Sequence, residues 1–192
     1  YRVGLGYRYG RMMQAISGVH YNCSFPLQLW PVLGEVLQQH EVGQDFISSQ
    51  YFGLLRNYRR HGWLILYLFG NSPAPCSSFV KGRPHSLKEL APGTLYEPNA
   101  TSLRMSDLGY RNKSQSGVHI SVNSLQDYVR DLSAAVSTPH PEYEKIGVKV
   151  DGEYRQLNTN LLQIENEYYS YIRPKRVARS GEHPSQALQR GG

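Results

Sequence analysis

The sequence has few cysteines, no long apolar run and no excess of acidic residues. Two cysteines, Cys23 and Cys76, are too few for a disulfide scaffold of this length, which favours a reducing compartment such as the cytoplasm. The longest apolar run, residues 63–69, is far shorter than the roughly 20 residues of a membrane-spanning helix. We therefore expect a soluble protein with no membrane partner. No Cys or His cluster has the spacing of a zinc site.

The composition instead fits one globular domain with a moderate positive charge. Lys and Arg number 21 against 15 Asp and Glu, and the net charge of +6 favours an anionic ligand. Apolar residues make up 40% of the chain, which excludes a disordered polyampholyte. The chain starts at Tyr1 within a helix-like pattern and stops at Gly192 without a closing element. We expect residues 1–192 to be a single partial domain, truncated at both ends.

Apolar residues at helical spacing predict four helices. They cover residues 5–16, 29–39, 49–69 and 124–136. The last third of the 49–69 helix is apolar on every side, so we expect that end to be buried. Asn123 is the expected N-cap of the last helix.

Alternating apolar and polar residues predict the clearest strand at residues 19–25. Because successive side chains of a strand point to opposite faces, Tyr21 and Phe25 should lie in an apolar layer. His20 and Asn22 should share the other face, where an imidazole and an amide suit a ligand. The alternative, an ordinary solvent-exposed sheet face, is favoured on pattern alone.

Further strands are expected nearer the end of the chain. Residues 161–173 alternate, and Asp151-Gly152 has the composition of a type I′ hairpin turn. Residues 71–98 are rich in Pro, Gly and Ser and predict a loop. This mixture favours an α+β fold with a largely antiparallel sheet flanked by helices.

Arginines provide the other candidate binding groups. The guanidinium of Arg104 suits a carboxylate or phosphate, although a pair with Asp107 is the alternative. The basic run at residues 173–176 fits either a phosphate site or a patch that contacts nucleic acid. The glycines of residues 4–10 have no preceding strand and the wrong spacing for a dinucleotide site.

Three stretches together resemble the bacterial glutamate–cysteine ligases. They are residues 1–24, with M-Q-A-I-S-G-V-H-Y-N, residues 100–116, with A-T-S-L-R-M-S-D-L-G-Y-R, and residues 162–181, with L-Q-I-E-N-E-Y-Y-S-Y-I-R-P-K-R. The resemblance implies an incomplete glutamine-synthetase-like catalytic domain. It also implies a reaction, the first step of glutathione biosynthesis. Using ATP and Mg²⁺, the enzyme joins the γ-carboxylate of glutamate to the amine of cysteine through a γ-glutamyl phosphate.

The resemblance also implies roles for individual residues. The catalytic group comprises Arg104, His20 and Asn22, with His20 near Mg²⁺. The residues around the cysteine substrate are Tyr1, Leu5, Ile16, Tyr110 and Tyr169. The nucleotide is expected to contact Arg173, Lys175 and Arg176, because these side chains are positively charged. The glutamates that bind Mg²⁺ in this family lie outside residues 1–192, so the chain alone is expected to be inactive.

Two other functions stay open at this point. One is another carboxylate–amine ligase of the same superfamily, which would accept an amine such as ammonia. The other is a basic nucleic-acid-binding module, whose affinity would fall steeply with salt. The ligase interpretation predicts glutamate, cysteine and ATP as partners and no nucleic acid, and it leaves the oligomeric state open.

Overall fold

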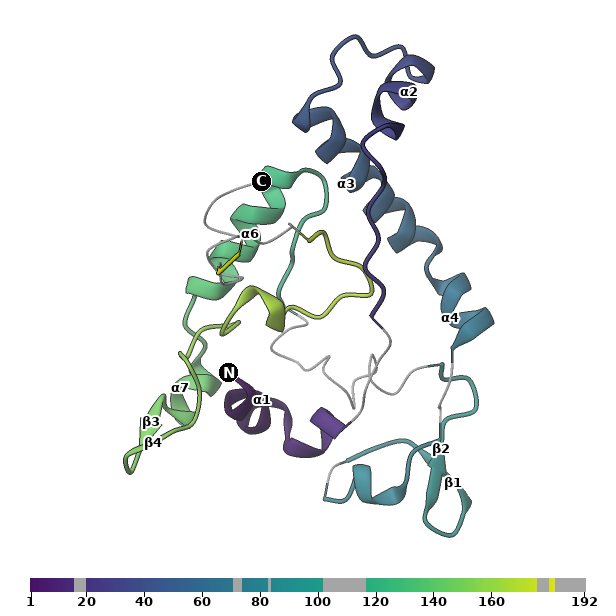
Figure 1. Cartoon of the computed structure of the whole chain (residues 1–192). Helices are drawn as coiled ribbons and strands as arrows, with labels where there is room; N and C mark the ends of the chain where they lie inside the picture. Colours follow the sequence, from purple (N-terminus) through teal and green to yellow (C-terminus); the bar gives the residue numbers. More distant parts are fainter. Residues whose placement is uncertain (16–19, 71–73, 83, 102–116, 176–179, 182–192) are drawn as a thin grey trace.

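The computed structural model describes residues 1–15, 20–70, 74–82, 84–101, 117–175 and 180–181 (Figure 1). Helices make up most of its regular structure. The α-helices are α1 (Arg2–Tyr9), α2 (Leu29–Val36), α3 (Gln44–His61), α4 (Trp63–Phe69), α6 (Leu125–Ser137) and α7 (Pro141–Ile146). The 3-10 segments are η1 (Arg11–Ala15), η2 (Ser77–Phe79) and η3 (Glu165–Glu167). Within these ranges, no helix has the length and apolar character needed to cross a membrane.

The described strands form two separate antiparallel hairpins. One joins β1 (Lys88–Ala91) to β2 (Thr94–Tyr96), and the other joins β3 (Lys149–Val150) to β4 (Glu153–Tyr154). The second confirms the predicted turn, because Asp151 and Gly152 have φ of 52° and 83°, as a type I′ turn requires. The α+β class and the antiparallel pairing are confirmed, but these short strands do not join into one sheet.

Two predicted strands are wrong over the described residues. Of the predicted strand 19–25, residue 19 lies outside the described residues. Residues 20–25 are extended and exposed and pair with no described strand (Figure 1). Tyr21 is 88% exposed, and Phe25 packs on Trp30 and Tyr51 instead of in a sheet layer. Residues 161–173 contain η3 and turns instead of a strand. Their start is bound to the end of α6, where Leu162 N donates to Ala135 O over 3.1 Å. A backbone hydrogen bonded to a helix end is not available for a strand ladder.

The helices agree with the periodicity, with local corrections. The opening helix stops at Gly10, whose φ of 89° suits glycine, and the predicted 49–69 helix begins earlier and divides at Gly62 into α3 and α4. The N-cap of α6 is Ser124 instead of Asn123, because its hydroxyl accepts from Asp127 N over 3.1 Å. The predicted loop at 71–98 contains β1 and β2, and α7 was not predicted.

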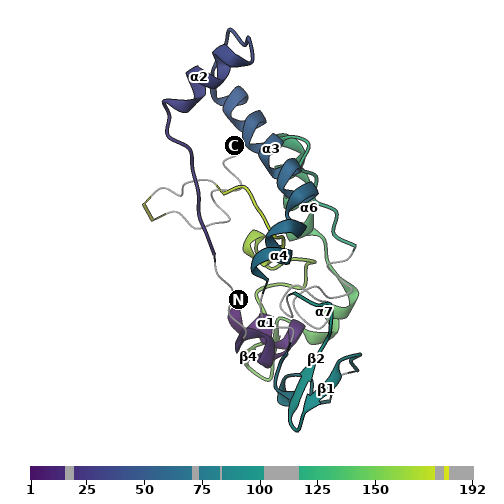
Figure 2. The same ribbon diagram turned by 90° about the vertical axis from the view of Figure 1, so that its right-hand side faces the viewer.

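The prediction that the end of the 49–69 helix is buried is also wrong. None of the residues of α4, all of them described, is buried. The helix follows α3 and lies at the outer side of the molecule (Figures 1 and 2). An apolar helix needs a covering element to be buried, and the described part of this chain supplies none for α4.

The main hydrophobic core lies between α3 and α6. Its buried members are Phe52, Leu55, Ile120, Val122, Tyr128, Leu132, Ala135 and Leu162. A smaller cluster lies on α1, where Leu5 and Tyr9 are buried against Tyr1, Phe79 and Tyr169. The smaller cluster joins the start of the chain to residues more than 150 positions later, and it positions the candidate site.

Candidate active site around helix α1

Helix α1 brings together three of the five residues that were predicted to surround cysteine. Tyr1 and Leu5 lie one turn apart, with Leu5 N donating to Tyr1 O over 3.0 Å. Tyr169 packs on the same cluster from the far end of the chain. The other two, Ile16 and Tyr110, lie outside the described residues. A tyrosine pair beside a leucine presents apolar rings with polar tips, which suits a small amphipathic ligand.

A buried ion pair holds α1 in place. Arg8 Nη1 lies 3.1 Å from Glu167 Oε1, and both side chains are 0% exposed. The same guanidinium donates to Gln156 Oε1 over 2.9 Å and to the Asn158 carbonyl over 2.8 Å, and it lies 3.9 Å from the centre of the Tyr143 ring. With its donors used in this way, the desolvated cation has the partners that a buried charge requires.

The carboxylate of Glu167 is equally well bonded. Tyr9 Oη donates to Oε1 over 2.8 Å, and Gln163 donates to Oε2 from its backbone N over 2.6 Å and from Nε2 over 3.2 Å. These bonds join α1 to the segment that carries Tyr169. This network was not predicted from the sequence, since residues 161–173 were expected to form a strand. In the sequence, the only indication of this network was the adjacent pair Arg8 and Tyr9, with Leu5 one turn before them.

Gly4 allows α1 to approach that segment closely. A Cβ at this position would overlap the side-chain amide of Gln163. That amide is buried and bonded at both ends, because its Oε1 accepts from Leu157 N over 3.0 Å while Nε2 donates to Glu167. The amide therefore cannot move aside without breaking hydrogen bonds.

We expect Gly4→Ala to destabilise the chain by about 1–3 kcal/mol, the usual cost of overpacking a filled interior. Urea denaturation followed by circular dichroism measures the change. Gly53→Ala in α3 is the matched control, because its added Cβ meets only the end of the Arg56 side chain at 3.7 Å. Equal stability of the Gly4 variant and the native chain would contradict the close packing.

The remaining predicted site residues are not joined to this cluster by any described contact. His20 and Asn22 are exposed on the extended segment 20–25. Arg104 lies outside the described residues, so its approach to His20 stays a prediction. Among the described residues, no three His, Cys, Asp or Glu side chains are grouped closely enough to hold a metal. Mg²⁺ prefers several oxygen ligands, so the described residues do not fit a Mg²⁺ site by themselves.

The predicted nucleotide residues have mixed surroundings. Arg173 Nη1 donates to the carbonyls of Tyr168 over 2.8 Å and Asn166 over 3.3 Å, so this guanidinium holds the turn after η3. Lys175 is exposed, and Arg176 lies outside the described residues. Arg173 therefore has a structural use, which leaves its contact with a nucleotide a prediction.

Glu165 differs from its neighbour Glu167. Both of its carboxylate oxygens are buried and have no hydrogen-bond partner among the described residues. Burial raises the pKa of Glu165, and the nearby charge of Arg173 opposes that shift. A raised pKa in the folded state means that folding favours the protonated acid. Stability from this group is present below its unfolded pKa and is lost as the pH rises through the folded value.

We expect Glu165→Gln to stabilise the chain at neutral pH, because the buried negative charge is removed. The difference from the native chain should shrink as the pH falls and the native carboxyl becomes protonated. Thermal melts between pH 4 and 7 measure both effects, since those pH values span the usual range of a carboxyl group and neutrality. A variant that is less stable at neutral pH would contradict the assignment.

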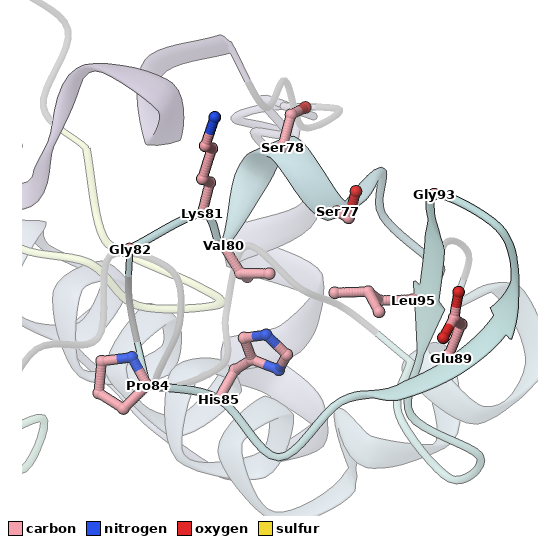
Figure 3. Close-up of a pocket in the computed structure, with 10 residues that line it drawn as sticks. All are labelled: Ser77, Ser78, Val80, Lys81, Gly82, Pro84, His85, Glu89, Gly93 and Leu95. Atoms are coloured by element: carbon pink, nitrogen blue, oxygen red, sulfur yellow. The ribbon is translucent and has the colours of Figure 1, made fainter.

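The cavities outside the core include the following two, both lined by described residues. One, of about 910 Å³, lies beside the β1–β2 hairpin; Ser77, Lys81, His85 and Glu89 are among its lining residues (Figure 3). The other, of about 420 Å³, lies along α1; Arg2, Tyr7, Arg11 and Gln14 are among its lining residues. Two arginines beside the second cavity favour anions there. Neither cavity was predicted from the sequence.

Comparison with known proteins identifies the family. A family model described as glutamate–cysteine ligase matches residues 1–192. The glutamate–cysteine ligase of Pseudomonas aeruginosa is 56% identical over 192 residues, which cover 100% of this chain and 36% of that protein. The Shewanella oneidensis ligase is 58% identical over 194 residues, covering 100% of this chain and 37% of that protein.

A solved structure agrees with these relatives. The glutamate–cysteine ligase of Francisella tularensis, crystallised in complex with AMP, matches with a TM-score of 0.84 and 44% identity. The match covers 98% of this chain and 36% of that chain. The chain thus spans little more than a third of the relatives it matches. Along its whole length, this chain belongs to the glutamate–cysteine ligase family.

Proposed function

We propose that this chain supplies the cysteine-binding part of an ATP-dependent glutamate–cysteine ligase. The observation that carries the proposal is the cluster on α1, which joins Tyr1 and Leu5 to Tyr169. The family assignment supports the reaction, and the AMP complex of the Francisella tularensis relative supports the use of an adenine nucleotide. Residues 1–192 would be a single partial catalytic domain of the glutamine-synthetase-like type.

The proposed reaction has two steps. A γ-carboxylate oxygen of glutamate attacks the γ-phosphorus of ATP, the bond to ADP breaks, and a γ-glutamyl phosphate forms. The cysteine amine then attacks the acyl carbon, the bond to phosphate breaks, and the amine loses a proton. Dispersed negative charge develops in both steps, so Arg104 would act by charge stabilisation, with His20 and Asn22 on the same surface.

Cysteine would lie against the α1 cluster. Leu5 and Ile16 would form the apolar wall, and the hydroxyls of Tyr110 and Tyr169 would donate to the cysteine carboxylate. Arg173, Lys175 and Arg176 would provide positive charge for the nucleotide. Mg²⁺ would bind together with ATP. The described residues do not form a site for it, so its ligands would come from elsewhere in the ligase. Two free cysteines support a cytoplasmic location.

A chimera tests the proposal. In it, this chain replaces the matching stretch of the Pseudomonas aeruginosa ligase, with which it aligns over 192 residues. We expect phosphate release that depends on ATP, glutamate and cysteine, whereas the 192-residue chain alone should release none. Stronger activity with ammonia than with cysteine would contradict the assignment. The parent ligase, prepared in parallel, controls for the assay.

Arg104→Lys in the chimera keeps the positive charge but removes the planar guanidinium group, which can donate two parallel hydrogen bonds. We expect kcat/KM to fall roughly tenfold or more, about 1.4 kcal/mol of transition-state stabilisation. Arg60→Lys is the matched control, because Arg60 is exposed on α3 and should tolerate the change. An unchanged kcat/KM for the Arg104 variant would show that Arg104 has a structural role.

A further inference from the structure

Helix α4 presents an apolar surface that nothing in the described chain covers. Its exposed large apolar residues are Trp63, Leu64, Ile65, Tyr67, Leu68 and Phe69. Trp63 is 64% exposed and Phe69 is 77% exposed. Exposing seven successive apolar side chains to water is unfavourable. A helix of this composition is therefore stable only when it packs against another apolar surface.

The extended segment 20–25 also lacks the covering partner that its residue pattern predicts. Its side chains alternate between apolar and polar types, as in a strand with one covered face, yet Tyr21 is 88% exposed. The backbone N of Phe25 donates to the Tyr51 hydroxyl over 3.0 Å. Within the described residues, no strand lies beside it. Its last residue contacts α3, where the Phe25 ring stacks on Tyr51, and Figure 2 shows the rest of the segment as an extended trace. Such an edge can accept strands from another part of a protein.

We propose that the polypeptide that completes a full-length glutamate–cysteine ligase covers both surfaces. Its strands pair with residues 20–25, and its apolar side chains pack on α4. The relatives supply the reason for this occupant, because this chain spans only 36–37% of their length. A second copy of this chain is the alternative occupant, and the concentration dependence of the labelling below distinguishes it. The inference rests on the family and does not depend on the proposed reaction.

Hydroxyl-radical footprinting with mass spectrometry tests this docking surface. The 192-residue chain and the chimera are labelled in parallel at several protein concentrations. We expect Tyr21, Trp63 and Phe69 to be labelled severalfold more slowly in the chimera at every concentration. Tyr154 in β4 is the reference, because its hairpin lies far from α4 (Figure 1).

Three footprinting results would overturn the inference. Equal labelling of the two proteins would show that these surfaces stay open. Protection that appears in the 192-residue chain only at high concentration, together with a dimer mass, would assign them to a second copy. Protection of that chain only by anionic lipid vesicles would assign α4 and the preceding Arg59 and Arg60 to a membrane surface.

A variant provides an independent measurement. Trp63→Glu with Phe69→Glu should leave the melting temperature of the 192-residue chain unchanged, because both side chains are exposed there. The same pair should lower the melting temperature of the chimera, where the charges would be buried. Equal effects in the two proteins would contradict the inference. If the chimera shows the expected protection from labelling but has no ligase activity, the proposed function is rejected and the docking surface is retained.

Discussion

Replacing Glu167 by glutamine is expected to destabilise the chain by about 3 kcal/mol or more. The substitution keeps the shape of the side chain but leaves the guanidinium of Arg8 buried without its counter-charge. Removing one partner of a buried pair usually costs about 3–5 kcal/mol, because the remaining charge has lost its solvent as well as its partner. Here the pair is 0% exposed and also holds Tyr9, so no water can replace the carboxylate.

Urea denaturation measures the loss of stability, with the m-value checked for two-state behaviour. Glu165→Gln is the matched control two residues away, for which we expect the opposite sign. A double variant, Arg8→Met with Glu167→Leu, should recover part of the loss, since an apolar pair can replace a buried ion pair. A small effect of Glu167→Gln with no recovery in the double variant would contradict the account.

The same substitution should also affect the proposed cysteine site in the chimera. Glu167 touches no proposed substrate atom and acts as a positioning residue, because it fixes α1 against the segment that carries Tyr169. We therefore expect KM for cysteine to rise more than kcat falls. An equal fall in activity with all three substrates would indicate a purely structural role.

Leu162→Ala is the second large effect, with an expected loss of about 2–5 kcal/mol. Leu162 is 0% exposed and packs in the core between α3 and α6. Truncation leaves a cavity among side chains held by two long helices, which limits relaxation around it. Urea denaturation measures the difference in unfolding free energy.

Leu157→Ala is the matched control for that substitution. Leu157 lies in the same segment but is about half exposed, so its loss should change stability by less than about 0.5 kcal/mol. Similar losses at the two positions would show that the core does not depend on Leu162 in the way described.

Local sequence patterns predicted the features that depend on neighbouring residues. The helices at 29–36 and 125–137 follow from apolar spacing, and the β3–β4 turn follows from Asp151-Gly152. Each of these is decided by contacts within a few residues. Boundaries were less predictable. Gly10 ends α1 through a positive φ of 89°, whereas Gly62 keeps helical dihedrals and allows a close approach of Tyr58. The burial of α4 was predicted wrongly. An apolar composition shows that a helix would be more stable when covered, but it does not show that another element covers it.

The candidate site was predictable only in part. The resemblance named Tyr1, Leu5 and Tyr169 together, and the structure gathers them in one cluster. The ion pair that positions this cluster was not predicted. Glu165 and Glu167 are the same residue type two positions apart, yet one is unpartnered in the described chain and the other has several partners. Nothing in the local sequence distinguishes them.

The sequence by itself determined the family, the α+β class and the local helix and turn signals of this protein. Tertiary structure alone decided that Arg8 and Glu167, 159 positions apart, are buried together, and that residues 20–25 lie without a described strand beside them. The physical reason is that helix spacing and turn conformation act over a few residues. Burial of a charge or pairing of a strand depends on which distant surface reaches it.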